Sequence, residues 1–321
     1  MSHGAEANAA SPRAGRAASG TPRFSIVVPA YQADTTLAET LDAIRAQTFE
    51  DWECIVVDDG SSDATAGIAD GYAREDPRIR VIHQVNKGTA AAYNTGVAGA
   101  LAEYVVICSA DDVLLPEHLS TMAAFVESEA EFDIWTSNGY LWRPGGKTEL
   151  VYDRGPGEPI HSMELADVIR VCFYGVGAVY RRKIFDLVGG YRLDVYTEDY
   201  DFWLRAMALG ARHRYLPKAL SLWRQSPTQK SAGFETVYRS DMRLVTELRR
   251  DFSLTAEQLA AVEDNIADRE RLIARLHGRR DIYREVLRPL PRRMVIGAIG
   301  HDRARRLKRI VRTAMGRGSS R

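Results

Sequence analysis

Residues 24–65 read FSIVVPAYQADTTLAETLDAIRAQTFEDWECIVVDDGSSDAT, and in them short runs of β-branched residues alternate with helix-like stretches. The runs are typical of buried strands, and in the other stretches apolar residues recur near helical spacing. The same alternation continues to residue 109. Repeated βα units predict an α/β fold, with a mostly parallel central sheet and helices on both faces. The expected strands span residues 24–29, 52–59, 79–84 and 104–109, and the expected helices span residues 34–47, 61–75 and 88–100.

The rhythm changes after residue 112, where strands and helices no longer alternate regularly. The PGG at residues 144–146 indicates strands folded about a turn, and residues 236–284 are charged and helical. Pro289 and Pro291 end that helical stretch, because proline has no backbone N–H to donate. The other expected elements are a helix at 114–128, strands within 132–153, a strand and a short helix within 176–191, a helix from residue 197 and two short strands within 213–224.

The composition is that of a soluble globular protein, with 45% apolar and 27% charged residues in a chain of 321. No apolar run approaches the roughly 20 residues that span a bilayer. The opening segment is rich in small residues and in Ser, and it lacks the apolar core of a secretory signal. We therefore expect a cytoplasmic protein whose first residues are disordered. Three widely spaced cysteines in apolar surroundings favour buried, reduced thiols, and they are Cys54, Cys108 and Cys172.

A formal net charge of zero conceals a strongly basic C-terminal end. Residues 271–321 hold sixteen Arg or Lys against three Asp or Glu, a net charge of +13. Leu307, Ile310 and Val311 lie on one face of a helix there, which leaves most cations on the other faces. Such a tail is expected to contact an anionic membrane peripherally, at its cytoplasmic side. A docking helix for a protein and a merely solvated tail are the alternatives, and nucleic acid is not an expected partner.

Charged, polar or turn-forming residues follow each of the four expected strands. The carboxyl ends of parallel strands form one edge of a sheet, where ligands bind. Acids cannot hold a phosphate directly, so two adjacent acids at one strand end indicate a divalent cation, Mg²⁺ or Mn²⁺, that bridges to a diphosphate. The strand-end residues are Pro29, Ala30 and Tyr31, then Asp58 and Asp59, then Lys87, and last Asp111 and Asp112.

Four motifs follow one another along the chain. They are residues 29–65, NKGTAAAYNTGVAGA at 86–100, ADDVLLP at 110–116 and YRRKIFDLVGGYRLDVYTEDYDFWLR at 180–205. Taken in this order, they resemble the family 2 glycosyltransferases. The resemblance spans residues 24–224 and implies the nucleotide-sugar-binding GT-A fold, a form of the α/β fold, and inversion at the anomeric carbon of the transferred sugar. The chain would then comprise a disordered segment at 1–22, a GT-A domain at 23–232, a helical extension at 233–288 and a basic amphipathic tail at 289–321.

The resemblance also implies roles for individual residues. Asp199 corresponds to the general base, and Asp111 with Asp112 to the metal-binding acids. The expected donor is a nucleotide sugar, with a UDP-sugar favoured, and the expected acceptor is a hydroxyl of a glycan, a lipid-linked molecule or a small molecule. The residues expected around the donor nucleotide are Pro29, Ala30, Tyr31, Asp58, Asp59, Lys87 and Asp111.

The chemistry of Asp199 supports its assignment independently. Attack by a hydroxyl on a nucleotide sugar needs a base, and a positioned carboxylate contributes about 10²- to 10⁴-fold. Thr197 is expected to cap the helix that carries Glu198 and Asp199 in its first turn, where the helix dipole favours ionised acids. The simpler interpretation is that the two acids only complement the dipole.

Two residues depart from the family pattern. Ser109 stands where many relatives have an Asp, and Ser226 stands where a His is common. These departures suggest one alternative, a noncatalytic module that binds sugar nucleotides or glycans. A nucleotidyltransferase is a second alternative, because such enzymes share α/β nucleotide binding and acidic metal sites. A nucleotidyltransferase would need a phosphate-binding loop rich in Gly and Arg or Lys after residue 29, and PAYQADTT is not one.

Other features bear on the substrate class. The chain has no Gln-x-x-Arg-Trp motif, which favours transfer of a single sugar in cell-surface polysaccharide or glycoconjugate biosynthesis over polymer synthesis. Tyr174, Tyr191 and Trp203 would suit a sugar platform, although such rings are more often core. The four histidines at 83, 118, 161 and 213 are scattered and are expected to make ordinary hydrogen bonds.

Overall fold

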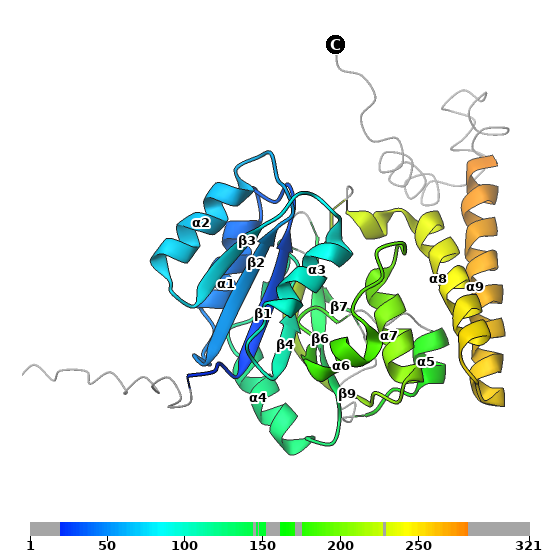
Figure 1. Cartoon of the computed structure of the whole chain (residues 1–321). Helices are drawn as coiled ribbons and strands as arrows, with labels where there is room; N and C mark the ends of the chain where they lie inside the picture. Colours follow the sequence, from blue (N-terminus) through cyan, green and yellow to red (C-terminus); the bar gives the residue numbers. More distant parts are fainter. Residues whose placement is uncertain are drawn as a thin grey trace, which may run out of the picture.

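The computed structural model describes residues 20–143, 146, 148–151, 161–170, 175–226 and 229–281. A single sheet crosses the molecule, with helices on both of its faces (Figure 1). The strands are β1 Phe24–Ala30, β2 Trp52–Asp58, β3 Ile79–His83, β4 Tyr104–Ile107, β5 Val113–Leu114, β6 Ile134–Trp142, β7 Thr148–Leu150, β8 Val179–Arg181 and β9 His213–Arg224. The helices are α1 Leu37–Arg45, α2 Thr65–Glu75, α3 Thr89–Ala98, α4 His118–Ser128, α5 Leu165–Arg170, α6 Lys183–Val188, α7 Glu198–Ala208, the 3-10 turn η1 Lys230–Ala232, α8 Phe234–Asp251 and α9 Ala256–Asp281.

Several predictions concern residues outside these ranges. They are the disordered start of the chain up to residue 19, the first two residues of the PGG turn, Cys172, Tyr174 and the basic tail beyond residue 281. Cys54 and Cys108 are buried free thiols, as predicted. The stretch predicted to be helical from residue 236 forms two helices, α8 and α9, with a short connection at 252–255.

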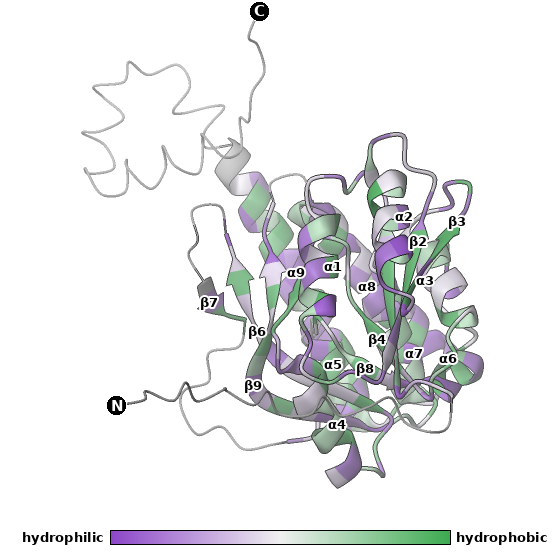
Figure 2. Cartoon of the chain, turned by 90° about the vertical axis from the view of Figure 1, so that its left-hand side faces the viewer, coloured by the Kyte–Doolittle hydropathy of each residue, from purple (hydrophilic) through white to green (hydrophobic). Residues whose placement is uncertain are grey.

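The first half of the sheet confirms the predicted βα pattern. Strands β3, β2, β1 and β4 lie side by side in that order and are all parallel. Successive side chains of a strand point to opposite faces, so Val27 packs with α3 on one face, and Ile26 with α1 and α4 on the other. Both faces are covered by helices, which explains why β1 and β2 are mostly apolar and are buried along nearly their whole length (Figure 2).

The second half makes the sheet mixed. Strand β8 lies between β4 and β6 and is antiparallel to both, whereas β6 and β9 are parallel. The complete order is β3-β2-β1-β4-β8-β6-β9-β5, and β7 pairs with β6. The prediction of a mostly parallel sheet therefore holds for the amino-terminal half, and the later strands add antiparallel pairs.

Residues 213–224 were predicted as two short strands, and that prediction is wrong because they form one strand, β9. Ser137 pairs with Leu216 and the next residue, Asn138, pairs with Ala219. Pro217 and its neighbour are thus left out of the ladder in a bulge, where the missing proline N–H does no harm. The strand can therefore continue past the proline to Arg224.

Helix α3 lies unusually close to the sheet at Gly96. A Cβ atom added there would lie 2.3 Å from Cγ1 of Val27 in β1. Gly67 in α2 is a matched case in open space, with no atom within 4 Å of its added Cβ. The close approach at Gly96 fixes the position of α3 against β1.

We predict that Gly96→Ala lowers the free energy of unfolding by about 1–3 kcal/mol, since an added methylene must displace backbone or side chains in a packed core. Gly67→Ala should raise it by about 0.5–1 kcal/mol, because alanine is the better helix former. Urea unfolding of both variants measures this. Equal effects in the two helices would contradict the close packing.

Candidate active site

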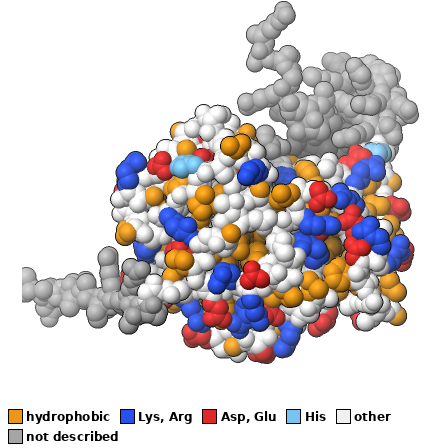
Figure 3. Space-filling view, in the orientation of Figure 1, with side chains coloured by type: hydrophobic (Ala, Val, Ile, Leu, Met, Phe, Trp, Pro, Cys, Tyr) orange, Lys and Arg blue, Asp and Glu red, His pale blue; other side chains and the backbone are white. Residues whose placement is uncertain are grey.

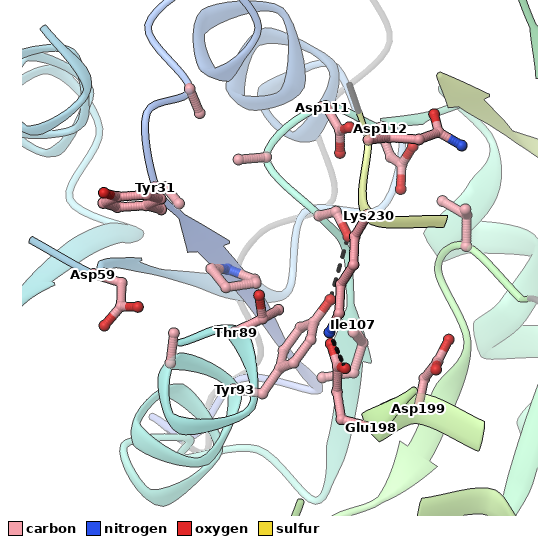
Figure 4. A pocket seen from close by; sticks show the side chains of 18 of the residues that line it. Tyr31, Asp59, Thr89, Tyr93, Ile107, Asp111, Asp112, Glu198, Asp199 and Lys230 are labelled. Carbon is pink, nitrogen blue, oxygen red and sulfur yellow. Dashed lines mark hydrogen bonds and ion pairs between the residues drawn. The ribbon is translucent and has the colours of Figure 1, made fainter. Parts of the chain in front are cut away.

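The carboxyl ends of β1, β2 and β4 meet the start of α7 around a cavity of about 880 Å³. In Figure 4, Asp111 and Asp112 lie on one side of this cavity, Glu198 and Asp199 on another, and Tyr31 and Asp59 on a third. The structure thus brings together residues from motifs about 170 positions apart in the sequence. The predicted site residues that line the cavity are Pro29, Ala30, Tyr31, Asp59, Asp111, Asp112 and Asp199.

Two predicted nucleotide-binding residues, Asp58 and Lys87, are not among the lining residues. The carboxylate of Asp58 accepts the N–H of Ser61 at 3.1 Å and bonds Nδ1 of His83 at 3.0 Å. Although burial opposes ionisation, these hydrogen bonds lower the pKa of Asp58. The backbone N–H of Lys87 donates to Asp59 at 2.9 Å, and its side chain is exposed. Both residues shape the loops beside the cavity, and their contact with a nucleotide stays a prediction.

Asp59 organises the loop between β3 and α3. Its two carboxylate oxygens accept the N–H groups of Lys87 and Gly88, at 2.9 and 2.8 Å, and the side chain of Gln84 at 2.7 Å. Gly88 has a φ of +88°, a conformation that glycine adopts without strain. Asp59 therefore holds the start of α3 at the cavity edge.

The acid pair lies at the end of β4. Asp112 is buried, and its carboxylate accepts the backbone N–H of Arg224 at 3.1 Å. Burial raises the pKa of Asp111, and burial together with the charge of Asp111 raises the pKa of Asp112 well above its usual value. Two neighbouring carboxylates that are enclosed in this way favour a cation beside them.

Arg224, at the end of β9, partly offsets the charge of the pair. Its Nε donates to the backbone carbonyl of Asp111 at 2.9 Å, and its guanidinium lies 4.0 Å from the ring centre of Trp142 and forms an ion pair with Glu39. The guanidinium therefore pairs with Glu39 and binds the backbone of the acid turn. No local pattern in the sequence predicts this contact, because Arg224 and Asp112 are 112 residues apart.

The donor set at Asp111 and Asp112 fits a hard divalent cation. Carboxylate oxygens are the ligands that Mg²⁺ and Mn²⁺ prefer, and Mg²⁺ commonly takes one or two of them and completes its shell with water and substrate phosphates. Among the described residues, no group of three or more His, Cys, Asp and Glu side chains could hold a metal. The two acids would thus need oxygens from a ligand to complete the shell. The histidines take other roles, such as His118, whose ring bonds the carbonyls of Leu220 and Gly177.

Asp199 projects into the cavity from the first turn of α7 (Figure 4). Asp199 is an exposed residue that lines the cavity, although enough protein surrounds its carboxylate to desolvate it. Burial, and then the charge of Glu198, raises the pKa of Asp199 to about 6, while Lys230 and the N–H of Tyr200 favour the ionised form. An acid with a pKa near 6 is ionised at neutral pH and is more basic than an ordinary aspartate.

The neighbours of Asp199 are fixed by long-range contacts. Glu198 is buried and forms an ion pair with Lys230, whose ammonium lies 5.0 Å from the ring centre of Tyr196. Thr197 occupies the position before the helix, but its side chain does not cap it. The prediction of a Thr197 side-chain cap is wrong, because its hydroxyl bonds Ser240 of α8 at 2.8 Å.

Sequence reasoning missed Tyr93, which lies between the two acid pairs in Figure 4. Its hydroxyl bonds Oγ of Ser109 at 3.2 Å, so the residue that replaces an acid of the family pattern has a hydroxyl partner. A signal was present, since Tyr93 is the one aromatic residue among the small residues of α3. Tyr191 and Trp203 are buried, as expected of core rings, and they also line the cavity.

Comparisons with known proteins identify the family. A family model described as glycosyl transferase family 2 matches residues 25–189. The chain is 32% identical over 217 residues to the uncharacterized glycosyltransferase EpsJ of Bacillus subtilis, which covers 64% of this chain and 62% of EpsJ. It is 39% identical over 147 residues to the glycosyltransferase GlyG of Streptococcus pneumoniae, which covers 46% of this chain and 48% of GlyG. The matches thus span less than two thirds of these relatives.

Solved structures show the same fold. Residues of this chain superpose on TarS 1-349 of S. aureus in complex with UDP-GlcNAc with a TM-score of 0.66 and 21% identity, over 82% of this chain and 76% of that one. The mannosyltransferase PcManGT of Pyrobaculum calidifontis, in complex with GDP-Man and Mn²⁺, gives a TM-score of 0.59 and 19% identity, over 77% and 70% of the two chains. At these identities the likeness concerns the fold, and it confirms the predicted GT-A fold.

The raised pKa of Asp199 predicts how Asp199→Asn affects stability. Folding raises this pKa above its unfolded value, so ionisation destabilises the wild-type fold as the pH rises from about 4 to about 6. Asparagine has no such charge and can still accept the N–H of Tyr200. The melting temperature of the variant, relative to wild type, should therefore be higher at pH 8 than at pH 4. A difference that does not vary with pH would contradict the raised pKa.

Proposed function

The chain belongs to glycosyl transferase family 2, and we propose on that premise that it transfers a single sugar, with inversion, from a nucleotide sugar to a hydroxyl acceptor. One observation carries the proposal: a single cavity is lined by the acid pair Asp111 and Asp112 on one side and, on another, by Asp199, whose pKa is raised. One side suits the diphosphate of a donor. The other side suits the hydroxyl of an acceptor.

The nucleotide would lie at the carboxyl ends of β1 and β2. Tyr31 is 54% exposed beside the cavity, so a base has access to its ring, and Pro29, Ala30 and Asp59 line the same side. Related structures were solved with UDP-GlcNAc and with GDP-Man, which supports a nucleotide-sugar donor. A UDP-sugar remains our preferred donor.

The diphosphate would lie next to the acid pair. Asp111 and Asp112 would hold Mg²⁺ or Mn²⁺, which when bound would supply positive charge to the diphosphate and so stabilise the leaving nucleotide. Arg224 holds both acids in place, because its backbone N–H donates to the carboxylate of Asp112 and its Nε donates to the backbone carbonyl of Asp111. PcManGT, solved with Mn²⁺, supports a divalent metal for this chain.

Asp199 would act as the general base. The acceptor oxygen attacks the anomeric carbon as Asp199 takes its proton, and a new C–O bond forms on that side. The bond from the anomeric carbon to the phosphate oxygen breaks on the opposite side, and its electron pair leaves with the nucleoside diphosphate. Displacement of this kind inverts the anomeric carbon. The raised pKa of Asp199 favours acceptance of the proton.

The acceptor and the biological context are proposals from the sequence. We propose a glycan, a lipid-linked molecule or a small molecule as the acceptor, in cell-surface polysaccharide or glycoconjugate synthesis in the cytoplasm. No helix within the described ranges has the length and apolar character to span a membrane. The basic tail that would contact an anionic membrane lies beyond residue 281, outside the described residues.

The acid pair predicts that donor turnover requires a divalent cation. Excess EDTA should abolish release of nucleoside diphosphate, and added Mn²⁺ or Mg²⁺ should restore it. Asp112→Asn should lower turnover about 10²-fold or more, because the diphosphate then loses its charge compensation. Full activity in EDTA would contradict the metal assignment.

Asp199→Asn should lower turnover by about 10²-fold or more with nearly unchanged donor affinity, as expected when a general base is lost. A thermal-shift screen of nucleotide sugars first identifies the donor, and coupled release of its nucleotide then gives kcat and KM. In wild type, the same assay should show turnover falling as the pH drops below about 6, where Asp199 takes up a proton. Normal turnover of the variant would mean that Asp199 only complements the helix dipole. A noncatalytic binding module would show donor binding without turnover in wild type.

A further inference from the structure

The chain that leads into α7 and to Asp199 contacts the helical extension through Thr197. The hydroxyl of Thr197 bonds Oγ of Ser240 in α8 at 2.8 Å. Val237, one turn earlier in α8, lines the cavity itself. The next residue after Ser240 is Asp241, which is 1% exposed. Helix α8 thus faces the base-bearing turn with both apolar and polar side chains.

Asp241 is held by a cation from α9. Nε and Nη2 of Arg269 both lie 3.4 Å from one carboxylate oxygen of Asp241, and the Arg269 side chain is largely buried. A buried ion pair contributes little net stability, because its two charges must be desolvated. By contrast, charges of both signs are interspersed over the outer surface of α8 and α9 (Figure 3), and Arg249 and Glu263 form an exposed ion pair between the two helices. The buried pair faces α7.

The extension also touches the residue that follows Asp199. Asn265 of α9 is 1% exposed, and its amide donates to the carbonyl of Ile169 at 2.7 Å and lies 3.4 Å from the hydroxyl of Tyr200. That hydroxyl donates to the same carbonyl at 2.9 Å. The N–H of Tyr200 in turn donates to the carboxylate of Asp199 at 2.8 Å. Helices α8 and α9, which follow the predicted catalytic domain, therefore contact the chain both before and after Asp199.

We propose that Ser240 and Asp241, with Arg269 behind them, are positioning residues for Asp199. The helical pair at residues 234–281 is then a working part of the site, because it fixes the turn of the base and places a second negative charge near it. This inference rests on the proposed role of Asp199 as general base. None of the three residues touches the reacting atoms.

Electrostatics gives the pair a second effect. Asp241 and Asp199 repel each other, and like charge disfavours ionisation of a carboxyl group. Burial first, and the charge of Asp199 as a smaller cause, raises the pKa of Asp241 to about 6, while Arg269 lowers it. Because the repulsion is mutual, an ionised Asp241 disfavours ionisation of Asp199. The other charged groups that act on Asp199 are Glu198 of α7 and Lys230 of η1. The charge of Asp199 in turn raises the pKa of the buried hydroxyls that face it, on Tyr93 of α3, Tyr180 of β8 and Tyr191 before α7.

Asp241→Asn tests this inference without a substrate. The carboxyl carbon of Asp199, labelled with ¹³C and assigned from its loss in Asp199→Asn, is titrated by NMR in wild type and variant. Removal of the neighbouring charge should move the midpoint of Asp199 from about 6 to lower pH, by about half a unit or more. Glu263→Gln is the matched control, because it breaks an ion pair between the same helices at the exposed surface. Its midpoint should equal that of wild type.

Ser240→Ala tests the positioning alone and leaves the buried ion pair intact. Hydrogen exchange measured by mass spectrometry should become faster at the amides of residues 198–201 in this variant, and should not change there in Glu263→Gln. An unchanged Asp199 midpoint in Asp241→Asn, or unchanged exchange in Ser240→Ala, would overturn the proposal. A shifted midpoint in Glu263→Gln would do the same, since any loss of helix pairing would then suffice. These results are independent of turnover, so they can fail while sugar transfer by the chain stands.

Discussion

The organisation of this protein depends on the cost of enclosing several carboxylates around one cavity. Asp111, Asp112, Glu198 and Asp199 all line it, and burial raises the pKa of Asp111, Asp112 and Asp199. The charge of a neighbouring acid raises the pKa of Asp112 and Asp199 further. A buried charge without a partner is expensive. Each group of acids accordingly has a cation nearby, Arg224 at the first pair and Lys230 at the second. With this charge balance, the acids can bind a cation or exchange a proton.

Both cations come from one stretch of chain at the end of β9. Arg224 is the last residue of that strand, and Lys230 opens the 3-10 turn that follows. The strand reaches this point because the bulge at Pro217 lets it continue along β6. The prediction of two short strands within 213–224 did not include this continuity, which carries the strand to Arg224. An irregularity of the sheet thus supports the electrostatics of the site.

The helical pair after the sheet is coupled to the same site. Its outer surface carries exposed ion pairs, which are worth little for stability. Its inner surface carries polar groups, of which Ser240 bonds Thr197 before the helix and the buried Asn265 lies beside Tyr200 after Asp199. Polar groups at an interface between helices specify one arrangement more sharply than apolar packing does. The cavity is therefore bounded by elements from both the sheet and the extension.

The sequence by itself determined the βα units, the strand ends and the acids that lie there, because strand and helix periodicities and turn residues are local signals. It also indicated the family, through motifs that follow one another in a fixed order. Only the tertiary structure decided which groups neutralise which acids. Arg224 lies 112 residues from Asp112, and Ser240 lies 43 residues from Thr197, so no local pattern could pair them. It likewise decided that Asp58 and Lys87 shape loops beside the cavity, and that Thr197 bonds α8 and does not cap its own helix. A raised pKa at Asp199 also required the fold, because desolvation depends on every element packed around a group and not on its neighbours in sequence.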